Sequence, residues 1–296
     1  MLYYLLFIGG MIVSQINSVA LYKKYQLIAG TALRANVLYM IVNGVISALA
    51  PGLVLLISRK EFQVTPYSLV FATATVICSA ISLILMLKVY EKGQIAIINI
   101  LVTVGGIILP CLWGVLFLNE ELSGRSIMAI LIMIGAVFFV IDRNGEKIKK
   151  DLIWMCVVIV IANCMITMLG KQHQIEVRYD TVDTLSFSIW VGVIRTILFG
   201  TLGIPYLVCK AGWRRVPGVS KSVTLAVISS VVSSCCYIIT LVTAMVLPVV
   251  ITSPLGTGIG MVMSSFLPWV LYREKLKKKQ IVGVILSFIG VILFLV

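Results

Sequence analysis

Long uncharged runs of apolar residues, separated by short charged or turn-rich breaks, divide the chain into ten segments. Most runs are close to 20 residues long, the length that an α-helix needs to cross a hydrocarbon core of roughly 30 Å. The uncharged stretch 223–272 is too long for one span, and we divide it at Leu247-Pro248 because proline fits the first turn of a helix. The predicted spans are 2–21, 36–57, 67–87, 95–118, 126–141, 152–170, 185–208, 223–245, 249–272 and 281–296.

Two interrupted runs occupy corresponding places in the fourth and ninth predicted spans. Gly106 precedes Glu120 by 14 positions, and Gly260 precedes Glu274 by 14 positions. This correspondence predicts an internal repeat of about 154 residues, the offset between the two acids, with copies at 1–145 and 146–296. Each copy holds an odd number of spans, so the second copy must enter the membrane from the opposite side. The predicted fold is all-α and integral to the membrane, with ten transmembrane helices in two inverted five-helix repeats.

Glycine and proline within these two runs predict broken helices. Broken helices leave backbone groups free to meet a solute at the interface between inverted repeats. The residues expected at the breaks are Gly105, Gly106, Pro110, Pro254, Gly256, Gly258 and Gly260.

Composition supports a membrane protein and argues against a nucleic-acid-binding one. The chain is 60% hydrophobic and 12% charged, with a mean hydropathy of +1.12, which leaves too little polar residue to cover a water-soluble domain. Its net charge is +13, but the Lys and Arg residues lie in short clusters between apolar runs and do not form one basic face. We therefore expect contacts with lipid headgroups and none with nucleic acid.

Lys and Arg are unevenly divided between the two sides of the predicted spans. Connections after odd-numbered spans carry 18 of them, connections after even-numbered spans carry 5, and Arg195 lies inside a span. The positive-inside rule predicts that the richer side is cytoplasmic and that both chain ends lie outside. The expected location is a bacterial-type plasma membrane.

The connection before the last span of each half carries a family resemblance. It reads Leu118-Asn-Glu120-Glu121-Leu122 in the first half and Leu271-Tyr-Arg-Glu274-Lys-Leu276 in the second. Together with the two five-span halves, these motifs resemble the ten-helix EamA-type transporters of the drug/metabolite transporter superfamily, over the whole chain. The resemblance implies a central cavity among the first, third, fourth, sixth, eighth and ninth helices, and export of amino acids or other metabolites. It also implies cytosolic chain ends, opposite to the charge count.

Arg195 is the charge placed deepest within a predicted span, and two interpretations remain open. Its guanidinium group could hold a carboxylate or phosphate of a substrate. Alternatively, it could be a structural arginine that bonds carbonyl groups freed in a neighbouring broken helix. The family cavity is not centred on the seventh helix, which favours the structural role.

Other polar groups inside predicted spans are candidates for lining a substrate site, with hydrogen bonding between helices as the alternative for each. Ser230, Ser233, Ser234 and Tyr237 are spaced to share one face of the eighth span. The candidate substrate-binding residues are Asn17, Asn43, Asn99, Thr103, Asn163, Trp190, Arg195, Ser233, Ser234 and Tyr237.

The titratable residues suggest transport and not catalysis. All 11 acidic residues fall in connections or at span ends, so a buried carboxylate that trades protons for cationic drugs is not expected. We expect Glu120 and Glu274 to cap the last helix of each half. His173 is expected alone in a connection, the 7 cysteines as free thiols, and no metal or other cofactor. No phosphate-binding loop or hydrolase motif is present, and no enzyme activity is expected.

The sequence therefore predicts a secondary transporter whose halves rock about a small polar metabolite, an amino acid or a related compound, which is exported by alternating access. One alternative is an intramembrane enzyme acting on a lipid-linked substrate. Another is a flippase or regulatory subunit that needs a partner chain. A face of small residues in the last span, at Gly283, Ser287 and Gly290, suits either close helix packing or a homodimer contact.

Overall fold

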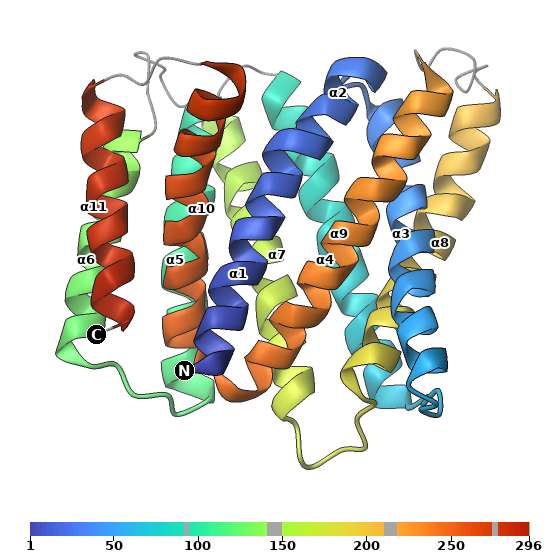
Figure 1. The fold of residues 1–296 in the computed structure, drawn as a ribbon, viewed down its shortest axis with the longest axis horizontal. Helices are drawn as coiled ribbons and strands as arrows, with labels where there is room; N and C mark the ends of the chain where they lie inside the picture. Colours follow the sequence, from blue (N-terminus) through green and yellow to red (C-terminus); the bar gives the residue numbers. More distant parts are fainter. Residues whose placement is uncertain (92–94, 141–149, 210–217, 274–277, 296) are drawn as a thin grey trace. The chain divides into compact units, whose positions relative to one another are not determined.

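A computed structural model describes residues 1–91, 95–140, 150–209, 218–273 and 278–295 (Figure 1). The regular secondary structure of these residues is entirely helical, because a backbone in lipid must satisfy its hydrogen bonds within its own segment. The elements are α1 (Leu2–Ile16), η1 (Asn17–Tyr22), α2 (Lys23–Ala29), α3 (Leu33–Ile57), α4 (Pro66–Glu91), α5 (Ile95–Phe117), α6 (Gly124–Val140), α7 (Lys150–Ile175), α8 (Thr184–Cys209), α9 (Val219–Val246), α10 (Val249–Tyr272) and α11 (Lys278–Leu295).

Each predicted apolar segment falls on one of these helices. Among the described residues, seven helices are long and apolar enough to cross a membrane, and two apolar helices are shorter, Leu101–Phe117 and Gly124–Phe139. Large apolar side chains such as Leu56, Leu131 and Leu202 are exposed, as expected for a surface that meets lipid. These features identify a multi-pass, all-helical membrane protein.

The first helical run extends beyond its predicted end at residue 21. Instead of ending before Lys23, it passes through the π-helix η1 and continues as α2 to Ala29. Lysine does not stop a helix at a membrane surface, because its long stem lets the ammonium group reach water. The run ends at Gly30, whose φ of 86° suits glycine.

The helices form two compact units. Unit 1 comprises Met1–Ile12, Ile77–Gln172 and Thr243–Val296, and unit 2 comprises Val13–Val76 and His173–Val242. Each unit therefore combines segments from both halves of the chain. The boundaries of the two compact units do not coincide with the predicted repeat boundary between residues 145 and 146. The repeat itself stays a prediction.

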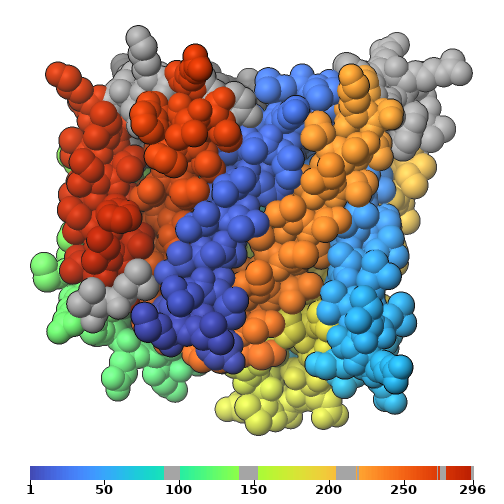
Figure 2. Space-filling model, in the orientation of Figure 1, coloured from blue at the N-terminus to red at the C-terminus, as the bar shows by residue number. Residues whose placement is uncertain are grey.

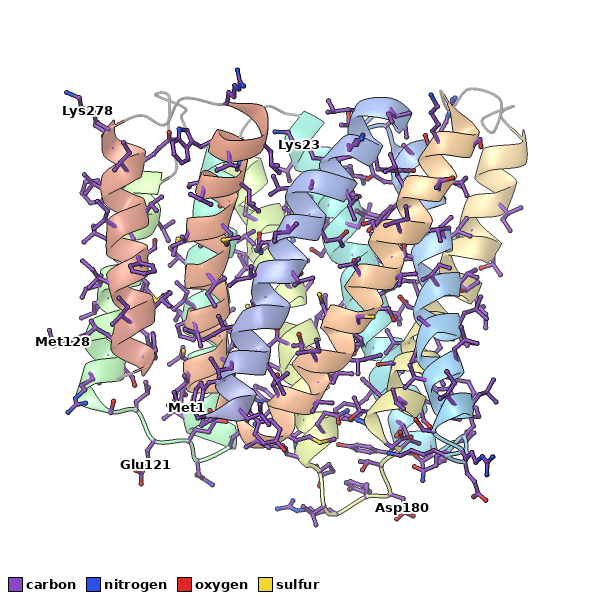
Figure 3. All side chains as sticks on the ribbon, in the orientation of Figure 1. Met1, Lys23, Glu121, Met128, Asp180 and Lys278 are labelled. Atoms are coloured by element: carbon purple, nitrogen blue, oxygen red, sulfur yellow. The ribbon has the colours of Figure 1, made fainter. Side chains whose placement is uncertain are left out.

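Two helix pairs in unit 1 combine the two halves of the sequence: α5 packs against α10, and α6 packs against α11. Within the second half, α10 also packs against α11. The helices α6 and α11 run in opposite directions (Figure 1), and α10 and α11 adjoin on the face shown in Figure 2. Met1 and Glu121 lie at one end of this unit, and Lys278 lies at the other (Figure 3).

The small-residue face of α11 is used inside unit 1. Gly283, Ser287 and Gly290 are buried, and Gly290 packs against the side chain of Met133 on α6. Of the two roles expected for this face, it serves close helix packing within the chain. It is therefore not available for a dimer contact.

Unit 2 is organised around the antiparallel pair of α3 and α8 (Figure 1). Gly192 on α8 lies directly against the backbone of α3, where an added Cβ would stand 2.6 Å from the carbonyl carbon of Ser47. Gly44 on α3 lies as close to Thr196, whose backbone nitrogen would be 2.8 Å from such a Cβ. Small residues at these positions let the two backbones approach closely. In this unit Asp180 lies at one end and Lys23 at the other (Figure 3).

The predicted breaks in the fourth and ninth spans are absent. Helix α5 continues through Gly105, Gly106 and Pro110. Helix α10 likewise continues through Pro254 and the three glycines Gly256, Gly258 and Gly260. A proline inside a helix removes the donor for one carbonyl group, four residues earlier, and the helix can continue if another donor reaches that group.

Side chains from neighbouring helices supply these donors. Ser253 Oγ donates to Gly106 O over 2.6 Å, and Gly106 is four residues before Pro110. Cys111 Sγ donates to Val250 O over 3.7 Å, and Val250 is four residues before Pro254. Pro110 and Pro254 thus each have the freed carbonyl satisfied by a residue adjacent to the other of the two prolines.

Candidate substrate-binding site

A chain of hydrogen bonds that begins at Arg195 links three helices of unit 2. Arg195 lies near the middle of the apolar part of α8, Thr184–Ile204. Its Nη1 donates to Asn43 Oδ1 on α3, and Asn43 Nδ2 in turn donates to Ser230 Oγ on α9 over 3.3 Å. Both polar atoms of the Asn43 amide are therefore engaged, and the guanidinium group is held by its outer nitrogen.

A second branch begins at Asn17, the first residue of η1. Asn17 Nδ2 donates to Ser229 O over 3.0 Å and to Ser233 Oγ over 2.8 Å. The hydroxyl groups of Tyr39 and Ser229 are 2.9 Å apart. A π-helical turn is rare, usually interrupts an α-helix, and is frequently found at functional sites. Here it begins at the residue that joins this branch to α9.

The face of α9 predicted from the serine spacing carries both branches. Ser230 receives the bond from Asn43, and Ser233, nearly one turn further along, receives the bond from Asn17. Tyr237 follows one turn after Ser233, and its ring packs against the cluster that contains Phe187 and Val191. Residues three and four apart on a helix lie on one face, so α9 aligns these groups along its axis.

Three buried polar atoms of this network have no hydrogen-bond partner among the described residues: Asn17 Oδ1, Arg195 Nε and Tyr237 Oη. Leaving a buried donor or acceptor without a partner costs about 1–3 kcal/mol, more for a charged group. The network thus holds one acceptor and two donors whose hydrogen bonds are not made within the described chain.

Arg195 also lacks a nearby carboxylate within its own unit. The four acidic residues of unit 2 are Glu61, Glu176, Asp180 and Asp183, and all of them precede or follow helices. The acidic residue nearest to Arg195 in sequence is Asp183, which directly precedes α8 and lies 12 positions before Arg195, or roughly 18 Å along the helix. A cation at the centre of a membrane helix costs about 2.5–3.5 kcal/mol on insertion scales.

Some predicted site residues lie apart from this network. Trp190, on α8, donates from Nε1 to Gln63 O over 3.1 Å and packs against Phe62, so its contacts are structural. Asn163, in unit 1, accepts a hydrogen bond from Ser82 Oγ over 2.7 Å. Thr103 is half-buried on α5 in unit 1. Asn99 is on α5, and its side chain lies outside the described residues. Ser234 is buried on α9 beside the network.

A charged junction in unit 1 was missed by the sequence analysis. Lys171 is buried and donates from Nζ to Ala244 O and Leu247 O, at the carboxyl end of α9. Glu120 accepts the backbone N–H groups of Val249 and Val250, each over 2.9 Å, at the amino end of α10. The cation and the anion therefore complement the two helix ends that meet at Leu247-Pro248.

Glu120 was expected to cap the last helix of its own half, α6, but it caps α10. Its connection lies beside the start of α10 because α5 and α10 are packed together. Glu274 lies outside the described residues. The sequence signal for Lys171 is its position directly after an apolar span, where the helix continues to Ile175.

His173 was also misplaced as a loop residue. It lies in the last turn of α7, fully buried, with its ring stacked on Phe187 at 3.9 Å between centroids. Its Nε2 is 2.8 Å from Ser68 Oγ. These contacts fit a packed histidine in the interior of unit 2.

Comparison with known proteins supports the fold. No family model matches the chain, and no curated protein matches it either. A protein of known crystal structure is similar to it with a TM-score of 0.78, over 99% of this chain and 98% of that one, at 10% sequence identity. At this identity the likeness concerns the fold alone.

Proposed function

We propose that the chain is a secondary transporter of the ten-helix EamA type, which moves a small polar metabolite across the plasma membrane by alternating access. An amino acid or a related compound is the preferred substrate and export the preferred direction, both taken from the family resemblance. The observation that carries the proposal is the polar network inside unit 2. It places a guanidinium group and two further unpartnered polar atoms, Asn17 Oδ1 and Tyr237 Oη, among membrane-length apolar helices.

The packing of the helices supports an inverted repeat. In a repeat that joins 1–145 to 146–296, the counterparts are α3 and α8, α5 and α10, and α6 and α11. Each of these pairs packs together within one unit. The reciprocal bonds between α5 and α10, from Ser253 to Gly106 and from Cys111 to Val250, relate the two helices in the same manner. A pseudo-twofold relation between the copies explains all three pairings.

Transport can be tested with the purified full-length protein in liposomes. Vesicles loaded with an unlabelled mixture of amino acids are expected to accumulate labelled amino acids by exchange, and vesicles without protein are not. Folded protein that exchanges none of a broad set of amino acids and related metabolites would contradict the proposed function.

The inverted repeat has a separate test. Reporter tags inserted before residue 2 and at residue 151 are expected on opposite sides of the membrane, because the two copies cross it in opposite senses. Tags found in one compartment would refute the repeat. The same tags decide whether the chain ends lie outside, as the basic residues predict, or in the cytosol, as the resemblance implies.

A further inference from the structure

We propose that Arg195, with Tyr237, is the point at which the network binds a carboxylate group, so that the substrates are small carboxylate-bearing metabolites and not cations or neutral solutes. This inference rests on the proposed function and names its substrate class. The first support is the state of the guanidinium group, which bonds Asn43 through Nη1 and leaves its buried Nε without a partner among the described residues.

The two unpartnered atoms Arg195 Nε and Tyr237 Oη are hydrogen-bond donors, which favours a ligand group that accepts hydrogen bonds. Arg195 Nε can only donate, and a tyrosine hydroxyl donates readily to an oxygen that carries negative charge. Both atoms are buried and have no partner among the described residues, and Tyr237 packs in the same cluster as Ile194, the residue before Arg195. An oxyanion would accept from both, whereas a cationic ligand would be repelled by Arg195.

The charge of the site favours a carboxylate over a phosphate monoester. Among the described basic residues of unit 2, Arg195 lies in the middle of a helix, whereas Arg34 and Lys221 lie in the first turns of their helices and Lys23 lies in the last part of the run that ends at Ala29. One fixed positive charge balances one carboxylate. A phosphate monoester carries up to two negative charges at neutral pH and would bring an unbalanced charge into the apolar interior.

Asn17 supplies the remaining recognition element. Its unpartnered Oδ1 is an acceptor, and the same amide bonds Ser233, which lies one turn before Tyr237 on α9. A neutral amide oxygen can accept from an amino group or from a hydroxyl group. Amino acids and 2-hydroxy acids are thus the two sources of the carboxylate to be compared.

The test measures the unfolding temperature of the purified protein in detergent in the presence of amino acids and 2-hydroxy acids. For each acid, the corresponding carboxamide is tested separately as a control. At least one carboxylate is expected to raise the unfolding temperature, and its carboxamide is not. The series that raises the unfolding temperature more, amino acids or 2-hydroxy acids, identifies the class of carboxylate that the site binds. Absence of stabilisation by every carboxylate, or equal stabilisation by the amides, would overturn the assignment.

Variants separate binding from folding. Asn43→Asp places a carboxylate beside Arg195, keeps the side-chain size, and is expected to weaken ligand affinity on the order of 10- to 100-fold while the protein stays folded. Arg195→Gln should weaken it similarly, and Arg195→Lys less. Thr201→Ala, which removes an exposed hydroxyl that bonds the backbone of its own helix α8, is the control and should leave affinity unchanged. Wild-type affinity in Asn43→Asp would overturn the assignment.

The two proposals fail in different ways. Carboxylates that stabilise the protein without being exchanged across liposomes refute transport and leave the carboxylate site standing. Exchange of amides as readily as acids refutes the carboxylate site and leaves transport standing.

Discussion

The Ser253 hydroxyl group donates to the carbonyl oxygen of Gly106 over 2.6 Å, and this carbonyl is the one that Pro110 deprives of its helical donor. The bond lets α5 pass its proline without a break. It also ties α5 to α10 at the position where the sequence had suggested an interruption.

Replacing Ser253 with Ala should destabilise the protein by about 1 kcal/mol, because Gly106 O loses its donor in an apolar setting. In a Pro110→Ala background the loss should shrink, since the backbone N–H of the new alanine can bond Gly106 O. The coupling energy between the two positions is measured by unfolding the wild type, the two single variants and the double variant in mixed micelles. An equal loss in both backgrounds would show that Ser253 does not compensate for the proline.

Glu120→Gln should lower stability by about 1–2 kcal/mol, since a neutral amide offers one acceptor oxygen to the two N–H groups of Val249 and Val250 and no charge to the helix end. The exposed neighbour Glu121 gives a matched control, Glu121→Gln, which should change stability little. Denaturant unfolding compares the two variants. Similar effects from both would mean that the cap contributes nothing measurable.

Gly192→Ala should destabilise the protein by about 1–3 kcal/mol, because the added methyl group meets the backbone of Ser47 and Ala48, which cannot rotate away. Gly200→Ala on the same helix meets only the end of Ile204 at 4.0 Å and should be neutral or slightly stabilising. Thermal unfolding of the pair measures the difference. Equal stability would place α3 and α8 further apart than described.

Tyr237→Phe should leave stability within about 0.5 kcal/mol, because its hydroxyl has no hydrogen-bond partner among the described residues. The half-saturating concentration of a transported carboxylate should rise about 3- to 10-fold. Tyr39→Phe is the contrast, since its hydroxyl bonds Ser229 and its removal should lower stability. A loss of stability in Tyr237→Phe with unchanged transport would assign this hydroxyl to the fold.

Much of the fold could be predicted from the sequence because helix formation in lipid depends on local composition. The apolar runs located the helices to within a few residues, apart from α2, where Lys23 and Lys24 suggested an end that comes only at Gly30, and the end of α7, which continues past residue 170 to Ile175. Lysine marks a membrane surface without stopping a helix. The residue that does stop it is recognisable only once its positive φ is known.

The candidate site was predictable in part. Asn17, Asn43, Arg195 and Ser233 were each selected as polar groups within spans, and the structure places them in two hydrogen-bonded groups that both end on α9. Their binding of a substrate stays a prediction. Sequence spacing could not show that Glu120 reaches Val249, 129 positions away, or that Ser253 serves the carbonyl freed by Pro110. Such partners are set by which helices pack together, and the continuity of α5 and α10 depends on them.

The near contact of backbones at Gly192 has a mechanical consequence. A shift of α8 along α3 by even part of a turn would drive side chains into the main chain at Ser47, so residues 33–57 and 184–209 should travel as one solid piece. These stretches come from opposite halves of the polypeptide. A conformational cycle in which residues 1–145 move as a block relative to 146–296 would have to separate α3 from α8. A chemical cross-link between α3 and α8 should therefore leave the conformational cycle intact.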